Sequence, residues 1–365
     1  MPPAPTTDLP RAERTLAELF RDHGYATLHV GKWHLGDAAE SPEVHGFDVN
    51  IGGTHWGAPA TYFHPFRGLQ RNGEYRYVPG LGVGKKGDEL TDRLTDEALA
   101  LLDQVRDRPF FLNLWYHTPH TPIEAKPELT ARFRAKLRPE LKHQNPAYAA
   151  MVASLDANVG RVLDYLEAHD LARNTLVVFT SDNGGYVGTF DHLPVTSNAP
   201  LRSGKGSLYE GGIRVPTLVR WPGVIPAGTQ SREPLTCTDF WPTFHSLLGD
   251  PISPSDGLNL LPLWKDPSVR LAREALFFHY PHYYDTTTPA SAVRAGNAKL
   301  IHYFEDDRVE LYDLAGDPGE TTNRAPNDPA TAARLRSLLD AWRREVGAQM
   351  PKINASYRPP GTARP

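Results

Sequence analysis

Segments with a helical period alternate with short, almost continuously apolar runs along the first two thirds of the chain. Apolar residues recur at helical spacing over residues 90–105, and the run PFFLNLWY follows at residues 109–116. A strand of a parallel sheet reads as such an apolar run, because helices cover both faces of the sheet. The alternation therefore predicts an α/β fold, with a mostly parallel sheet flanked by helices.

The same pattern extends to both sides of this pair. Further helices are expected over residues 15–23 and from residue 145 to about 166, where Asn145 and Pro146 suit the first positions of a helix. Further strands are expected at residues 26–30, 175–181 and 216–221.

After about residue 264 the pattern changes to closely spaced short strands. They are expected at residues 276–280, 292–295, 299–304 and 309–314, before a helix over about 329–346. Short strands joined by tight turns favour an antiparallel sheet with a packed helix. We therefore predict a catalytic domain over residues 1–265, a smaller α+β subdomain over 266–350 and a tail over 351–365.

Composition excludes several classes of protein. The 365 residues carry a net charge of −4, so no strong field of either sign favours nucleic acid or an anionic membrane as a partner. No apolar run is long enough to span a bilayer, and the first ten residues do not resemble a signal peptide, which leaves the localisation open. The single cysteine, Cys237, allows no intramolecular disulfide and is expected to be a small buried hydrophobe.

Polar groups follow the predicted strands where each strand ends. In open α/β sheets ligands bind beyond the carboxyl ends of the strands, so these groups are the candidates for a site. They lie in the segments GKWHLG (31–36), HTPHTP (117–122), DNGG (182–185) and PLRSGKGS (200–207).

These segments together suggest a site for an anionic ester. Asp182 and Asn183 offer hard oxygen ligands of the kind that Ca²⁺ or Mg²⁺ prefers. Cationic or hydrogen-bond-donating groups are expected around them, namely Lys32, His34, His120, Arg202 and Lys205. A positive pocket in a slightly acidic protein suits a tetrahedral oxyanion ester.

An ordered series of motifs between about residues 9 and 346 resembles the type I sulfatases of the alkaline-phosphatase superfamily. The motifs are GYAT (24–27) leading to GKWHLG, HGFD (45–48), PHTP (119–122), DNGG, LRSGKG (201–206), EGGIRVP (210–216), TDFWPT (238–243), ELYDL (310–314) and DPGE (317–320). The resemblance implies the alkaline-phosphatase-like fold and the hydrolysis of sulfate monoesters, as in arylsulfatases.

The resemblance also implies roles for individual residues. Asp182 and Asn183 would be two of the metal ligands, usually for Ca²⁺. Lys32 and Lys205 would hold sulfate oxygens, and Lys205 with His120 would lie near the leaving-group oxygen as donor or general acid. His34 would orient the nucleophile. Arg202 is assigned to substrate binding, and the substrate would be a sulfated small molecule or a glycan.

The sequence departs from the family where the nucleophile is expected. Family members carry paired aspartates and a Cys-x-Pro-Ser-Arg or Ser-x-Pro-x-Arg motif before the GKWH segment, and neither occurs in these 365 residues. Formylglycine is therefore not encoded here, and we expect an N-terminally incomplete form of a sulfatase. Without that segment we also expect an open sheet edge, exposed apolar surface, weak metal binding and no turnover.

Two other functions stay open at this point. The chain could belong to a phosphate or phosphonate ester hydrolase of the same superfamily, or it could bind sulfated ligands without catalysis. Retention of His120 and Lys205 argues against a binder, because binding alone needs no leaving-group acid. The sequence indicates neither the identity of the substrate nor an oligomeric state.

Overall fold

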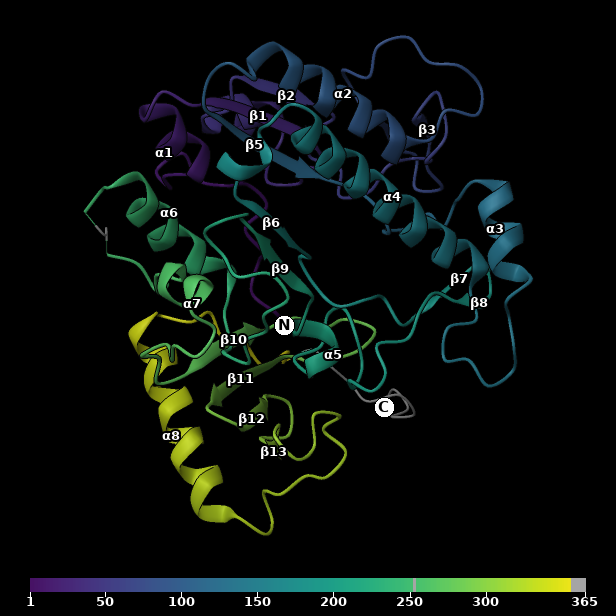
Figure 1. Ribbon diagram of the computed structural model, residues 1–365. Helices are drawn as coiled ribbons and strands as arrows, with labels where there is room; N and C mark the ends of the chain where they lie inside the picture. Colours follow the sequence, from purple (N-terminus) through teal and green to yellow (C-terminus); the bar gives the residue numbers. More distant parts are fainter. Residues whose placement is uncertain (252–253, 356–365) are drawn as a thin grey trace.

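The computed structural model describes residues 1–251 and 254–355 of the protein. Figure 1 shows a parallel sheet at one end, a four-stranded sheet with a long helix at the other, and a two-stranded ribbon between them. Most of the predicted tail, 351–365, lies outside the described residues. No described helix has the length and apolar character needed to cross a membrane.

The parallel sheet is built around one fully buried strand. Its strand order is β2 (Val49–Ile51), β1 (Ala26–Gly31) and β5 (Phe110–Trp115), and both pairings are parallel. α1 (Leu16–Asp22) leads into β1, and the reciprocal capping bonds between Thr15 and Glu18 fix its start. The predicted strands at 26–30 and 109–116 are confirmed.

Two long helices cover this sheet. α2 (Leu90–Val105) and α4 (Pro146–Ala168) pack against each other and form the upper right of Figure 1. Leu94 and Ala98 of α2 and Met151 of α4 share one core cluster with Leu28 and Val30 of β1. The apolar stripe predicted for α2 is therefore its buried face. The prediction for α4 is only partly right, because Met151 and Leu166 are buried whereas Val152 is 43% exposed.

The next two predicted strands do not join the parallel sheet. β6 (Val177–Thr180) pairs only with β9 (Thr217–Arg220) among the described residues, and the pairing is antiparallel. The prediction of a parallel arrangement is wrong here, because the connection between these strands contains only the four-residue helix α5 (Glu210–Ile213) and no crossover helix.

Open edges result from this arrangement. Within the described residues, β5 has β1 as its one neighbour, and β6 has β9. Trp115 at the end of β5 is 42% exposed, and Leu218 of β9 is 60% exposed. Within the described residues both strands thus have an unpaired edge, whereas the expected cover of such an edge by a further segment stays a prediction.

The C-terminal part is an antiparallel meander with one packed helix. β10 (Leu276–Tyr280), β11 (Ala290–Ala295), β12 (Ala298–Tyr303) and β13 (Val309–Asp313) pair in chain order. Leu335 and Leu339 of α8 (Pro329–Glu345) pack on the apolar side chains of this sheet. The prediction for this part is confirmed, whereas the domain boundary at residue 265 stays a prediction.

The remaining elements are short. They are the β3–β4 hairpin (Arg67–Leu69, Tyr75–Tyr77), the β7–β8 hairpin (Thr189–Phe190, Leu193–Pro194), α3 (Pro127–Arg134), α6 (Phe240–Leu248), α7 (Leu261–Lys265) and the 3₁₀ turns η1 (Ala38–Glu40), η2 (Pro42–His45), η3 (Ala172–Asn174) and η4 (Cys237–Asp239). Cys237 is exposed, so the prediction of a buried thiol is wrong. Asp239 takes the buried position of η4 instead, because its carboxylate accepts hydrogen bonds from Thr236 and Leu258 and pairs with Arg273.

Candidate active site

The ends of β1 and β5 lie side by side and carry the first candidate residues. Lys32 follows β1, and its backbone N–H donates to the Trp115 carbonyl at the end of β5, at 2.7 Å. The chain after β5 then reaches His117 and His120 within five residues. The parallel register of the two strands thus brings the GKWH and HTPH segments to one edge of the sheet.

His120 and Lys205 are in direct contact although 85 residues separate them in the sequence. Nζ of Lys205 lies 3.3 Å from Nε2 of His120, and Nδ1 of His120 lies 2.9 Å from the Thr121 carbonyl oxygen. A carbonyl oxygen only accepts, so Nδ1 is assigned the ring proton and Nε2 accepts from the Lys205 ammonium. Burial lowers the pKa of His120, and the charges of Lys205 and Lys32 lower it further, which favours the neutral ring.

Lys32 and Asp182 belong to the same cluster. Burial lowers the pKa of Lys32, the nearby carboxylate of Asp182 opposes that shift, and the charge of Lys205 adds to it. Asp182 also acts on the pKa of His120, in the upward direction. The ends of β1, β5 and β6 therefore lie near the Lys205 segment, residues 200–207. That these groups form an active site stays a prediction.

His34 is held at the edge of this cluster by the 52–57 loop. Its backbone N–H donates to the Thr54 carbonyl at 2.9 Å, and its ring packs on Gly57, where a Cβ atom would lie 2.4 Å from the ring. Burial lowers the pKa of His34, and the positive charges of Lys32 and Lys205 lower it further. His34 is exposed but lies close enough to Lys32 and Lys205 for their charges to act on its pKa.

Asp182 and Asn183 form the exposed turn after β6. The Asn183 N–H donates to Asp182 Oδ1 at 2.8 Å, and the Asn183 side-chain amide donates to the Gly184 carbonyl at 2.9 Å. Both side-chain oxygens are the kind of ligand that Ca²⁺ takes. Calcium takes about 6–8 such ligands, and the described residues contain no group of three or more His, Cys, Asp or Glu side chains that could hold a metal. The donors fit Ca²⁺ in kind but not in number, so we derive no step through a metal.

Arg202 is committed to other contacts. Its guanidinium donates to the Tyr312 hydroxyl at 3.0 Å and to the Glu320 carbonyl at 2.9 Å, and it lies 4.0 Å from the centre of the Tyr209 ring. These contacts join the Lys205 segment to the C-terminal sheet. All of these contacts are with groups of the protein, and a contact of Arg202 with substrate stays a prediction.

The fold adds three residues to the surroundings of the site. His117 belongs to the HTPHTP segment, in which His120 is the preferred candidate; His117 is buried, and burial with the nearby charge of Lys32 lowers its pKa to about 3, which favours the neutral ring. The β10–β11 connection contacts the Lys205 segment, since Thr286 donates to the Lys205 carbonyl at 2.7 Å and the Tyr284 ring packs on Gly206. No motif marks Thr286 or Tyr284, because only the fold brings them to the Lys205 segment.

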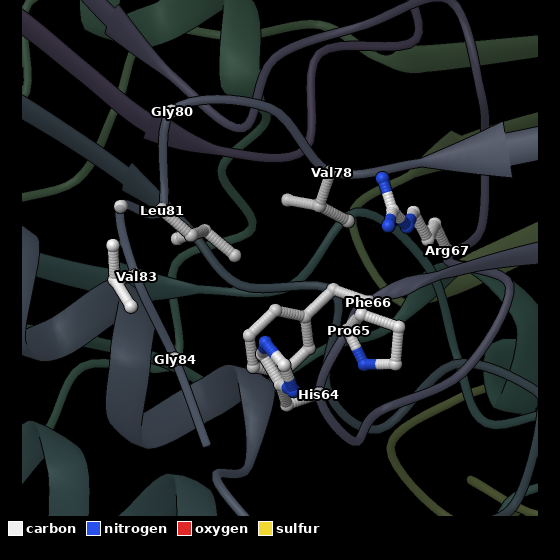
Figure 2. A pocket seen from close by; sticks show the side chains of 10 residues that line it. His64, Pro65, Phe66, Arg67, Val78, Gly80, Leu81, Val83 and Gly84 are labelled. Carbon is white, nitrogen blue, oxygen red and sulfur yellow. The ribbon is translucent and has the colours of Figure 1, made fainter. Parts of the chain in front are cut away.

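A cavity of about 360 Å³ lies elsewhere, between residues 64–67 and 78–84. Figure 2 shows His64, Pro65 and Phe66 on one side of it and Val78 and Leu81 on the other. None of the predicted site residues lines this cavity.

Comparisons with known proteins agree with the predicted family. The model of the sulfatase family matches residues 1–250, and that of the C-terminal part of N-sulphoglucosamine sulphohydrolase matches residues 204–345. A sulfatase of Formosa agariphila is 36% identical over 69% of this chain, and the chain spans half of that relative's length. Steryl-sulfatase of Mus musculus is 31% identical over 91% of the chain and 67% of its own length. N-acetylgalactosamine-6-sulfatase of Homo sapiens is 30% identical over 97% of the chain and 74% of its own length.

Solved structures share the fold. The crystal structure of Ps i-CgsB in complex with k-i-k-neocarrahexaose matches with a TM-score of 0.77 at 28% identity, over 93% of this chain and 76% of the other. The structure of BT4656 with D-glucosamine-2-N,6-O-disulfate matches with a TM-score of 0.73 at 22% identity, over 95% and 85% of the two chains. With the family model covering more than half of its residues, this chain belongs to the sulfatase family.

Proposed function

We propose that this chain carries the sulfate-binding and leaving-group part of a sulfatase active site that hydrolyses sulfate monoesters, in the manner of an arylsulfatase. The observation that carries the proposal is the 3.3 Å contact between Lys205 and His120, with Lys32 and Asp182 in the same cluster. Two ammonium groups beside a neutral imidazole offer charge-assisted donors for an oxyanion and a proton for a departing oxygen.

The charge states assign the roles within the pair. His120 accepts from Lys205, so the proton available to the leaving-group oxygen is on Lys205 at the start of the reaction. The bond from Lys205 to the Nε2 lone pair of His120 fixes the direction of the ammonium group within the site. Lys32 and Lys205 bind the sulfate oxygens, and His34 orients the attacking group from the other side of the cluster.

Attack on sulfur needs a nucleophile that these 365 residues do not encode in the family's form. A formylglycine aldehyde, which other residues would have to provide, would supply the oxygen nucleophile for sulfur, and Lys205 would protonate the departing ester oxygen. Asp182 and Asn183 are proposed as two of the ligands of Ca²⁺, or of Mg²⁺. Two side chains supply few of the ligands that the ion takes, so we propose weak metal binding.

The substrate is proposed to be a sulfated small molecule or a sulfated glycan. Relatives named for steryl and for N-acetylgalactosamine-6-sulfate substrates are about equally similar to this chain. Ps i-CgsB, at 28% identity, was solved with an oligosaccharide. The Tyr284 ring beside Gly206 offers an aromatic face suited to either a sugar or a steroid ring.

The purified 365-residue chain is expected to bind para-nitrophenyl sulfate without turning it over, with Ca²⁺ present. The lysines can hold the ester, but no covalent capture of sulfur follows. Release of para-nitrophenol is followed by absorbance after the intact mass of the chain has been confirmed. Turnover that disappears in Lys205→Ala would contradict this account of the missing nucleophile.

The other two functions give different results in the same experiment. A phosphate or phosphonate ester hydrolase should bind para-nitrophenyl phosphate more tightly than the sulfate. A protein that binds sulfated ligands without catalysis should retain its affinity for the sulfate ester in His120→Ala. It should also fail to hydrolyse the ester when the chain is joined to a segment that carries the nucleophile.

The affinity for an aryl sulfate is expected to fall as the pH rises from about 7 towards about 10. Burial lowers the pKa of Lys32, so Lys32 loses its proton at a lower pH than an ordinary lysine, whose pKa is about 10.4. The sulfate ester keeps its charge over this range. Calorimetric titration at several pH values should show a smaller pH dependence for Lys32→Met. An identical dependence in that variant would show that Lys32 is not the titrating group.

A further inference from the structure

We propose that Asn198 is a positioning residue that holds Lys205 beside the Asp182–Asn183 turn. The expected change in affinity for a sulfate ester rests on the proposed function. The position of Lys205 relative to the turn depends only on the hydrogen bonds of Asn198. Asn198 lies outside every motif considered above, in the connection between the β7–β8 hairpin and the Lys205 segment.

The side-chain amide of Asn198 bonds to both segments at once. Its Oδ1 accepts from the Gly185 N–H at 3.1 Å, and its Nδ2 donates to the Gly185 carbonyl and to the Ser203 carbonyl, both at 2.9 Å. The Lys205 N–H donates to the same Gly185 carbonyl at 3.1 Å. One amide therefore ties the turn that carries Asp182 to the backbone that carries Lys205.

Two glycines allow this close approach. A Cβ atom on Gly204 would lie 2.7 Å from Nδ2 of Asn198 and 2.3 Å from the Gly185 oxygen, and a Cβ atom on Gly185 would lie 2.9 Å from Oδ1 of Asn198. The Leu201 N–H also donates to the Asn198 carbonyl at 2.9 Å, so the main chain at 198 turns directly into the Lys205 segment. No larger residue fits at either glycine without moving the segments apart.

The chemistry of these bonds selects asparagine. They need one acceptor and two donor hydrogens in a single planar group close to the backbone, and a carboxylate supplies no donor hydrogen. An aspartate at this position would direct negative charge at two carbonyl oxygens. Alanine would leave the Gly185 and Ser203 groups without these partners, and the Lys205 segment would lose its fixed distance from β6.

A purely structural role for Asn198 would affect stability alone, so the test needs a control with similar bonds. Asn323 provides one, because its side chain accepts from the N–H groups of Leu311 and Ala325 in the C-terminal part of the chain. Asn198→Ala and Asn323→Ala are compared in full-length chains. Asn198→Ser is included as a milder change in case the alanine variant does not fold.

Two measurements are made on each folded variant. The first is the Kd for para-nitrophenyl sulfate, which Asn198→Ala is expected to weaken by about ten- to a hundredfold, since displacement of a binding group by about 1 Å has effects of this size. The second is the pKa of His120 by NMR titration, which should rise in Asn198→Ala as in Lys205→Met, because Lys205 moves away from the ring. Asn323→Ala should change neither quantity.

The outcomes separate this inference from the proposed function. If the wild-type chain does not bind the sulfate ester, the proposed function fails, while the His120 titration still tests the position of Lys205. If the wild-type chain binds and Asn198→Ala retains both its Kd and the pKa of His120, Asn198 does not position Lys205 and the inference is wrong.

Discussion

Replacement of Lys299 by methionine is expected to lower the free energy of unfolding by about 3–5 kcal/mol, the usual loss when one partner of a buried ion pair is removed. Lys299 on β12 is fully buried, and its Nζ lies 2.9 Å from Glu210 and 2.8 Å from Glu320. Both glutamates are also buried. Without the ammonium, Glu210 would keep only the more distant Arg294, at 3.8 Å, and Arg214, at 4.0 Å, and Glu320 would keep its hydrogen bond from the Glu210 N–H.

Loss of Lys299 is also expected to affect the candidate active site, because its partner Glu210 begins α5 directly after the Lys205 segment. Glu320 accepts from the Glu210 N–H at 2.6 Å, so the ion cluster fixes the end of that segment to the C-terminal part of the chain. Burial raises the pKa of Glu320, and the charge of Glu210 adds to this shift. Protonation neutralises Glu320, so the loss of stability in Lys299→Met should become smaller as the pH falls through that raised pKa.

Urea unfolding followed by circular dichroism measures this loss. Lys86→Met is the matched control, because Lys86 is exposed and its replacement should change the stability by less than about 0.5 kcal/mol. Adding Glu210→Gln and Glu320→Gln to Lys299→Met should restore part of the stability. Equal unfolding midpoints for Lys299→Met and Lys86→Met would contradict the role assigned to the cluster.

Replacement of Lys205 by alanine is expected to weaken the binding of a sulfate ester by about ten- to a hundredfold or slightly more. A hydrogen bond to a charged group contributes about 1.5–3 kcal/mol, which corresponds to this range of affinity. Lys205 is proposed to donate to the sulfate while its contact with His120 fixes its direction. Lys32→Ala should have an effect of similar size, because Lys32 lies in the same cluster.

Calorimetric titration with para-nitrophenyl sulfate measures both effects. Lys142→Ala removes an exposed lysine elsewhere and should leave the Kd unchanged, which controls for the net charge of the chain. Lys205→Arg should not restore full affinity, since a planar guanidinium cannot replace a compact ammonium against His120. Unchanged affinity in both Lys205→Ala and Lys32→Ala would place the sulfate site elsewhere.

The sequence predicts the parts of the fold that depend on local pattern. The apolar run at 109–116 and the short strands after residue 264 could each be placed because their periodicity and turns are encoded over a few residues. The antiparallel pairing of β6 with β9 could not be predicted, because it depends on how the chain returns from residue 181 to residue 217. Nothing in the composition of β6 or β9 distinguishes the two directions.

The same distinction applies to the site. His120 and Asp182 follow predicted strands, so an α/β pattern predicts that they lie near each other. Lys205 lies in the connection between β8 and α5, and its contact with His120 depends on how that connection packs. The contacts of Arg202 with Tyr312 and of Asn198 with Gly185 are different, because each depends on the packing of one loop against another. Cys237 was misplaced for a similar reason: the hydrogen bonds of Asp239 decide which side of η4 is buried.

The position of a bound tetrahedral oxyanion tests the central claim most directly. Crystals of the 365-residue chain would be soaked in selenate, whose selenium atom can be located by its anomalous scattering. The account predicts an anomalous peak within hydrogen-bonding distance of both Lys32 and Lys205, next to His120, and no such peak in Lys205→Ala. A peak in the cavity between residues 64–67 and 78–84, with none at the two lysines, would contradict the account.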